Sequence, residues 1–146
     1  MRRSMVSILT SQGQQHTTLS VLQVAEGMVL VPDIAIAEVV GWQRNIGDTF
    51  TWRDQVVSCL DLTDSQERAC VVVCHALYRP ENVFYALAVS GLPKMLRVNE
   101  DEIHDLDAKL IYPWQRGWVQ VKTQTNQLAA DRFILPDIEK LENTLP

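Results

Sequence analysis

Apolar residues fall along this chain in short runs that are rich in β-branched side chains. Turn-forming residues such as Glu26–Gly27 and Asn45–Asp48 separate neighbouring runs. The pattern predicts strands at Leu19–Val24, Met28–Val31, Ile34–Val40, Val56–Leu62, Cys70–Leu77, Val83–Val89, Trp118–Val121 and Arg132–Leu135. Many short strands with this spacing favour an all-β fold built from closed barrels, because closure removes unpaired sheet edges.

Helical patterning is confined to two places. Pro136 opens a segment in which Ile138, Leu141 and Leu145 share one stripe, so we expect a short C-terminal helix packed on a sheet. The apolar run Ile34–Val40 follows a possible cap at Asp33 and fits a short helix as well as a strand.

The chain length indicates one folded domain. Residues 1–17 contain three glutamines and little apolar pattern, which predicts a flexible N-terminal arm ahead of a domain over residues 18–146. A chain of 146 residues buries roughly 68–70% of its unfolded surface, enough to fold without metal or disulfide staples.

Charge and hydropathy exclude two classes of function. A net charge of −5 lacks the basic footprint of a nucleic-acid-binding protein. The longest nearly apolar stretch, Met28–Val40, is interrupted by charged residues and is shorter than the ~20 residues of a membrane span. With no readable export signal and an odd number of cysteines, we expect a cytoplasmic protein with reduced thiols.

The cysteines do not form a convincing metal or catalytic site. In an extended strand, Cys70 and Cys74 lie about 13 Å apart, and His75 points to the opposite face from Cys74. Cys59 also falls within an apolar strand, where burial raises a thiol pKa. An enzyme that uses Cys59 or Cys74 with His75 would need a depressed thiol pKa. The chain also lacks a G-x-S-x-G elbow and glycine-rich phosphate loops, so we expect neither catalysis nor a cofactor.

Four tryptophans remain as notable features: Trp42, Trp52, Trp114 and Trp118. Tryptophan and arginine dominate the anchor positions of protein interfaces, so these side chains are candidates for partner binding. Large aromatic side chains that close the ends of a small barrel explain the same pattern equally well.

Four segments, taken in order, resemble the blocks of the CheW-like family of bacterial chemosensory adaptors. The segments are PDIAIAEVVGW (32–42), TWRDQVVSCLDL (51–62), FYALAVSGLPKMLRVNEDEI (84–103) and ADRFILPDIEKL (130–141). The second matches the signature N-L-R-G-x-[VI]-[VI]-P-[VI]-[VI]-D-L at Arg53 and at its apolar positions. The signature's glycine and proline are Asp54 and Ser58 here, and the aspartate of the third block is Ser90. The chain is therefore similar to divergent accessory members, such as those of pilus-motility systems.

The resemblance implies a fold and a role. It implies two intertwined five-stranded SH3-like barrels around a shared apolar core, with a short C-terminal helix. It also implies a non-enzymatic adaptor that couples the cytoplasmic tips of chemoreceptors to the regulatory domain of a sensor histidine kinase in membrane-associated arrays. Ile36 and Glu38 match positions that contact receptor or kinase, and Trp52, Arg53 and Asp54 fall at the signature arginine, near the groove that faces the receptor.

The residues themselves leave alternatives open. Arg53 could instead pair internally with Asp54 or Asp61, and Glu38 could be a simple solvated charge. A stand-alone β-barrel that binds a small ligand or another protein is the alternative function, if the changes at Asp54, Ser58 and Ser90 abolish array binding. We expect a monomer in isolation.

Overall fold

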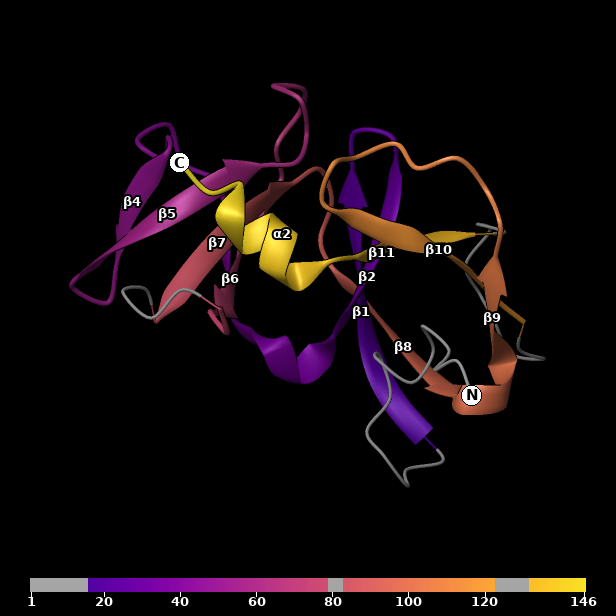
Figure 1. The fold of residues 1–146 in the computed structure, drawn as a ribbon. Coiled ribbons are helices and arrows are strands. Elements are labelled where there is room, and N and C mark those ends of the chain that lie inside the picture. The colour runs from indigo at the N-terminus through magenta and orange to yellow at the C-terminus, as the bar shows by residue number, and fades with distance from the viewer. Residues whose placement is uncertain (1–15, 79–82, 123–131) are drawn as a thin grey trace.

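Two β-sheets and one short helix make up the protein. The computed structural model describes residues 16–78, 83–122 and 132–146 (Figure 1). Within them, one sheet contains β1 (His16–Val24), β2 (Gly27–Pro32), β8 (Lys94–Asn99), β9 (Ile103–Leu106), β10 (Gln115–Val121) and β11 (Phe133–Pro136). The other contains β3 (Ile36–Gly41), β4 (Thr49–Trp52), β5 (Gln55–Asp61), β6 (Cys70–His75) and β7 (Phe84–Val89).

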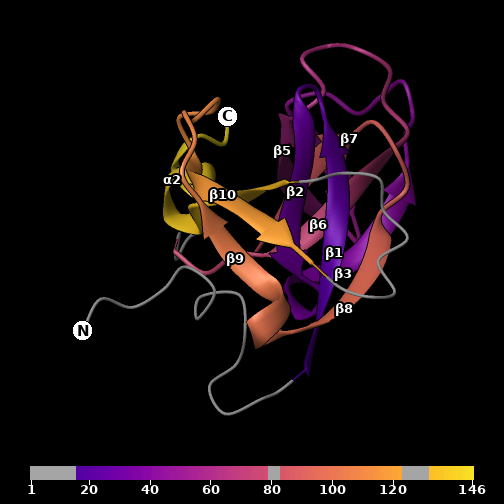
Figure 2. The same ribbon diagram turned by 90° about the vertical axis from the view of Figure 1, so that its right-hand side faces the viewer.

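The strand order interleaves distant parts of the chain. The six-stranded sheet has the order β8-β1-β2-β11-β10-β9, and the five-stranded sheet has the order β3-β6-β7-β5-β4. Most pairs are antiparallel, but β11 pairs with β2 and β5 with β7 in parallel. Because β10 and β11 return to the sheet that β1 and β2 began, the two halves are intertwined; Figure 2 shows the six-stranded half from the side.

Alternation along the strands divides the apolar side chains into three clusters. In β6, Val71 and Val73 point into the five-stranded half, whereas Cys70, Val72 and Cys74 point to the other face. That other face meets side chains from β1, β2, β10 and β11, so one cluster is shared by both sheets. The predicted architecture, two small barrels around a shared core, is therefore confirmed, with six strands in one sheet instead of five.

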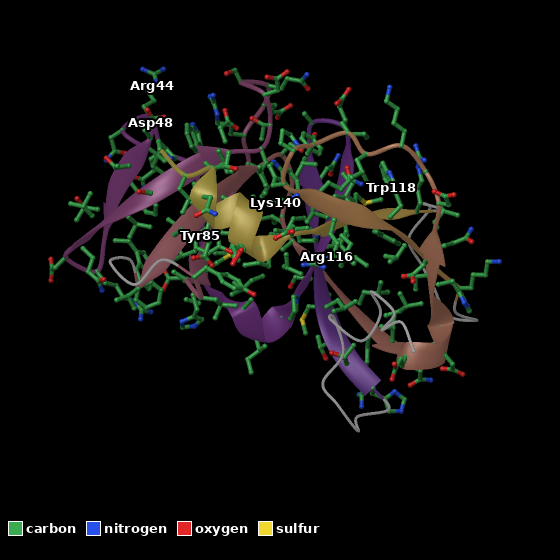
Figure 3. The ribbon with its side chains drawn as sticks, in the orientation of Figure 1. Arg44, Asp48, Tyr85, Arg116, Trp118 and Lys140 are labelled. Carbon is green, nitrogen blue, oxygen red and sulfur yellow. The ribbon has the colours of Figure 1, made fainter. Side chains whose placement is uncertain are left out.

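The C-terminal helix covers this shared cluster. Helix α2 (Ile138–Asn143) buries Leu141 against it, and Leu145 follows. Tyr85 of β7 and Trp118 of β10 lie on either side of the helix (Figure 3). The predicted stripe is confirmed, but the helix begins at Ile138. Pro136 ends β11, and the N-cap is Asp137, whose carboxylate accepts a hydrogen bond from the Lys140 backbone amide at 3.1 Å.

A buried carboxylate fixes the helix to the five-stranded sheet. Glu142 is fully buried and accepts hydrogen bonds from the backbone N–H groups of Leu77 and Tyr78, at 2.8 and 3.0 Å. Those amides follow β6 and would otherwise lack partners at the end of the strand. The side chain therefore satisfies two backbone donors and locates the helix along the sheet.

Each of the eight predicted strands corresponds to an observed strand. The segment Ile34–Val40, which fitted a helix as well as a strand, contains both a helical turn and a strand. A single 3-10 turn η1 (Asp33–Ala35) precedes β3. The search for apolar runs missed β4, β8 and β9, in which polar residues interrupt the apolar ones. Strand β1 begins at His16, two residues inside the predicted arm. The rest of that arm, residues 1–15, lies outside the described residues. A second 3-10 turn, η2 (Glu100–Glu102), joins β8 to β9.

Candidate functional site

Glu38 connects the two edge strands of the five-stranded sheet. It lies on β3, and its carboxylate accepts one hydrogen bond from the Trp52 indole N–H of β4 (Nε1 to Oε2, 3.1 Å). It accepts a second from the Arg53 guanidinium (NH2 to Oε1, 3.0 Å). Because β3 and β4 are the two ends of the strand order, these polar contacts help to close the five-stranded sheet into a barrel. We call this half of the molecule the second barrel and the six-stranded half the first barrel.

A tight hairpin turn presents Arg53 and Asp54. Trp52 pairs with Gln55, so only two residues make the connection between β4 and β5. Both have positive φ, 48° for Arg53 and 62° for Asp54. These angles are those of a type I′ turn, whose twist matches that of the flanking strands. The turn places both side chains in solvent at the tip of the hairpin.

Aromatic contacts hold this cluster in place. The Trp52 ring is 5% exposed and meets the Phe84 ring edge-on, with 4.8 Å between centroids. The Arg53 guanidinium carbon lies 4.7 Å from the Trp52 ring centroid. Trp52 therefore belongs to the core of the second barrel, and the surface above it is the arginine fork and the Glu38 carboxylate.

Electrostatics favour the ionised form of Glu38. The hydrogen bonds from Trp52 and then from Arg53 hold the pKa of this carboxyl below its usual value. Asp54 and Asp61 were the internal partners considered for Arg53. Both are wrong, because the ion pair of Arg53 is with Glu38. Asp61 instead binds Arg68, with NH2 2.7 Å from Oδ2. Glu38 is not a simple solvated charge, since both carboxylate oxygens have donors.

The structure brings four of the five predicted site residues together. Glu38, Trp52, Arg53 and Asp54 form this cluster, but Ile36 is half-buried against the shared core. Val56, which pairs with Thr51 next to the turn, is 76% exposed and was not singled out. The sequence does contain a signal for Val56. Side chains alternate between the two faces of a strand, so the neighbour of the inward-facing Val57 points outward.

A hollow lies between the two sheets. A cavity of about 260 Å³ is lined by the β1–β2 turn at Ala25–Glu26, by Leu60–Leu62, and by Tyr112 and Trp114. The two aromatic rings stack at 4.5 Å, and the Tyr112 hydroxyl accepts a hydrogen bond from the Glu26 amide at 3.1 Å. Arg53 does not border this hollow. It lies beyond the opposite end of β5, which spans roughly 20 Å at ~3.3 Å per residue.

The three cysteines are buried free thiols. Burial, reinforced by Asp61, raises the pKa of Cys59 to about 11, and burial raises that of Cys74 to about 12. Burial also raises the pKa of Cys70. The prediction of weakly acidic structural thiols is confirmed, and none has the depressed pKa that a nucleophile needs. In the described ranges, no group of three or more His, Cys, Asp or Glu side chains could hold a metal ion.

The tryptophans serve mainly as packing. Trp52, Trp114 and Trp118 are 5%, 4% and 2% exposed. Trp118 donates its indole N–H to the Lys109 carbonyl at 2.9 Å. Trp42 alone of the four is partly exposed, with the Arg68 guanidinium 4.9 Å from its ring centroid.

Two barrel-like sheets sharing one core, closed by a C-terminal helix, define the CheW-like fold. The crystal structure of the scaffolding protein TtCheW from Thermoanaerobacter tengcongensis superposes on this chain with a TM-score of 0.63. The match covers 90% of this chain and 91% of that one, at 11% sequence identity. No family model matches the chain, and no curated protein matches it. The helices that the structure describes all fall short of the length and hydropathy required to traverse a bilayer.

Proposed function

We propose that the protein is a non-enzymatic adaptor that couples chemoreceptors to a sensor histidine kinase, in the cytoplasm at receptor arrays. The observation that carries the proposal is the whole-chain similarity to a scaffolding protein of the same architecture. The buried thiols, whose pKa values are raised, are compatible with a role in binding. The four-segment resemblance suggests an accessory adaptor of a pilus-motility system, acting as a monomer between its partners.

The cluster around Glu38 is the proposed partner-binding surface. Arg53 is oriented by Trp52 and Glu38, so little side-chain entropy is lost when a partner binds it. Val56 adds exposed apolar area beside the turn. An ordered cation next to an apolar side chain is the combination that anchors many interfaces. Asp54 adds a negative charge at the tip and would influence which receptor or kinase is accepted.

A pull-down from the protein's own cells tests this function. We expect the native chain to recover a histidine kinase and methyl-accepting receptors, and an Arg53→Glu variant to recover less of both. Arg97→Glu, an exposed arginine on β8 of the other sheet, is the matched control and should behave like the native chain. Recovery of neither partner by the native chain would contradict the adaptor function.

A charge exchange separates the binding role of Arg53 from its structural one. In Glu38→Arg with Arg53→Glu, an ion pair can form again between β3 and the turn, but the charge offered to a partner is reversed. We expect the double variant to regain thermal stability relative to Arg53→Glu alone while recovering no more partner. Partner recovery that returns together with stability would mean that Arg53 only closes the barrel.

A further inference from the structure

A second hollow, larger than the one between the two sheets, lies on the second barrel, away from the proposed partner-binding surface. A cavity of about 670 Å³ opens between the loop that follows β3 and the loop that follows β5. Its volume is within the range of small-molecule sites, about 300–1,000 Å³. Figure 3 shows Arg44 and Asp48, which border it, at the upper left, on the side of the five-stranded sheet.

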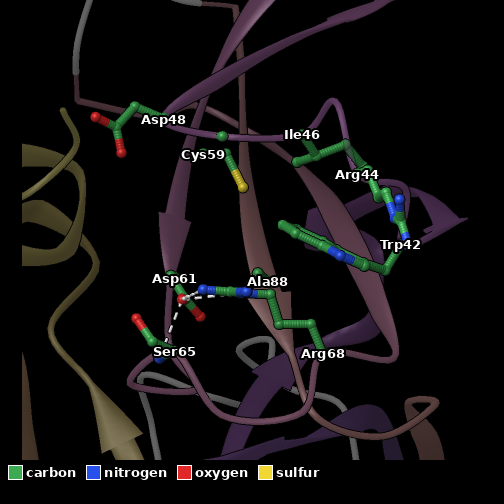
Figure 4. Close-up of a pocket in the computed structure, with 10 residues that line it drawn as sticks. Trp42, Arg44, Ile46, Asp48, Cys59, Asp61, Ser65, Arg68 and Ala88 are labelled. Atoms are coloured by element: carbon green, nitrogen blue, oxygen red, sulfur yellow. Dashed lines mark hydrogen bonds and ion pairs between the residues drawn. The ribbon is translucent and has the colours of Figure 1, made fainter.

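The floor and one wall of the cavity are apolar. Ile46, Cys59 and Ala88, all part of the second barrel's core, line its base. Trp42 adds an aromatic wall and is the partly exposed tryptophan of the four. In Figure 4 the Cys59 thiol points into the space between Trp42 and Asp61. A planar apolar group would therefore lose water on entering and would meet carbon and sulfur atoms.

The opposite wall is the ion pair between Asp61 and Arg68, in which both carboxylate oxygens already accept hydrogen bonds. Asp61 Oδ1 accepts from the Thr63 amide and hydroxyl, and Oδ2 accepts from the Ser65 amide and from two nitrogens of Arg68. The same guanidinium lies over the Trp42 ring. Arg68 is thus held from two sides in a set orientation and lines the cavity as a positioned cation, whereas the Asp61 lone pairs are occupied.

Arg44 brings further hydrogen-bond donors to the cavity. Arg44 lines the rim and makes no hydrogen bond or ion pair with any residue that the structure describes. Asp48 also borders the cavity, but Figure 4 shows its carboxylate directed away from Trp42 and Arg44. A guanidinium binds a carboxylate through two parallel N–H···O contacts, which selects an anion of planar geometry.

From this arrangement we infer that the cavity binds a small aromatic carboxylate, with its ring against Trp42 and its carboxylate at Arg44. The inference goes beyond the adaptor function and does not depend on it, since it rests on the cavity lining alone. The protein would then carry a ligand site as well as a partner surface.

Three probes of one shape test the charge requirement: phenylacetate, phenylacetamide and phenethylamine. Each is titrated into the ¹⁵N-labelled full chain while the four tryptophan indole N–H signals are followed, with the Trp42 signal assigned by a Trp42→Phe variant. We expect phenylacetate to shift the Trp42 signal saturably, with a Kd of about 1 mM, and the amide and amine to bind about tenfold more weakly.

Variants locate the anion contact. Arg44→Gln should weaken phenylacetate binding about tenfold, and the control Arg97→Gln on the other sheet should leave it unchanged. Because Arg44 is exposed and has no partner among the residues that the structure describes, its replacement should keep the spectrum of the folded chain. The inference is overturned if phenylacetate leaves the Trp42 signal unmoved, if the amide or amine binds as tightly, or if Arg44→Gln binds like the native chain.

Discussion

The two barrels of this protein are built from different side chains. The interior of the six-stranded half contains Leu19, Val21, Leu30, Leu96, Val98, Ile103, Val119, Val121, Phe133 and Leu135. The five-stranded half has Trp52 and Phe50 together with the small residues Ala86 and Ala88, and polar contacts of Glu38 help to close it. The larger cavity and the candidate partner surface both belong to this second half.

This difference teaches how one small fold separates stability from recognition. Large aliphatic side chains fill the first barrel and leave few groups free to bind a ligand. In the second barrel, Ala86 and Ala88 take little volume, and charged side chains such as Glu38, Arg53 and Arg68 hold its edges and loops. Groups that bind partners must remain near solvent, so the half that carries them depends more on polar contacts.

Core truncation should show the largest difference between the halves. Phe133→Ala, at a fully buried position of the first barrel, is expected to lower the free energy of unfolding by about 3–5 kcal/mol. Val57→Ala in the second barrel should cost about 2 kcal/mol, because a smaller apolar group is lost. Urea denaturation of both variants measures the two values. Equal costs would show that the size of the truncated side chain does not set the loss of stability.

The Asp61 network predicts a pH dependence confined to the second barrel. Partial burial opposes ionisation, yet the hydrogen bonds from Arg68 and Thr63 hold the pKa of Asp61 below its usual value. The carboxylate therefore contributes stability that is present above the unfolded pKa of about 3.9 and is lost as the pH falls through the folded value.

Asp61→Asn should accordingly lower stability by about 1–2 kcal/mol at neutral pH, after allowance for solvent screening. The difference from the native chain should shrink as the pH falls below about 4, as followed by thermal unfolding at several pH values. Asp107→Asn, at an exposed carboxylate just after β9, is a control from the other half of the molecule. A difference that stays constant with pH would exclude ionisation of Asp61 as the cause.

The hairpin turn should give the smallest effect, with the opposite sign. At φ 62°, Asp54 adopts a conformation that glycine takes without steric cost. Asp54→Gly should therefore raise the free energy of unfolding by about 0.5 kcal/mol, after part of the gain is offset by the entropy of the unfolded chain. Asp54→Ala should lower it, because Ala is strained at this φ. Calorimetric Tm values rank the three chains, and a stabilising alanine would contradict the turn assignment.

Much of the fold could be predicted from the sequence because its signals are local. Apolar runs located β5, β6 and β7, and the stripe of Leu141 and Leu145 located the helix. Strand β4 was missed because Phe50 and Trp52 are separated by polar residues, so that no apolar run marks them. Strand β9 is short and mostly exposed, and its only fully inward side chain is Ile103.

The candidate sites depended on contacts between residues far apart in the chain. Sequence reasoning chose Glu38 and Arg53 separately. It considered only Asp54 and Asp61 as internal partners for Arg53, because nothing local brings β3 beside β4. The cavity near Trp42 was not anticipated, since Arg44 and Arg68 carry no recognisable motif. Only the strand order places their loops on opposite sides of one hollow.

By itself, the sequence determined most of the strands, the short helix, the buried thiols and the set of charged and aromatic groups available for binding. These follow from local alternation and from the cost of exposing apolar side chains. The tertiary structure decided which groups meet: Glu38 with Trp52 and Arg53, and Arg68 with Asp61 and Trp42. Such pairings are set by strand order and by the shared core, which depend on the whole chain at once.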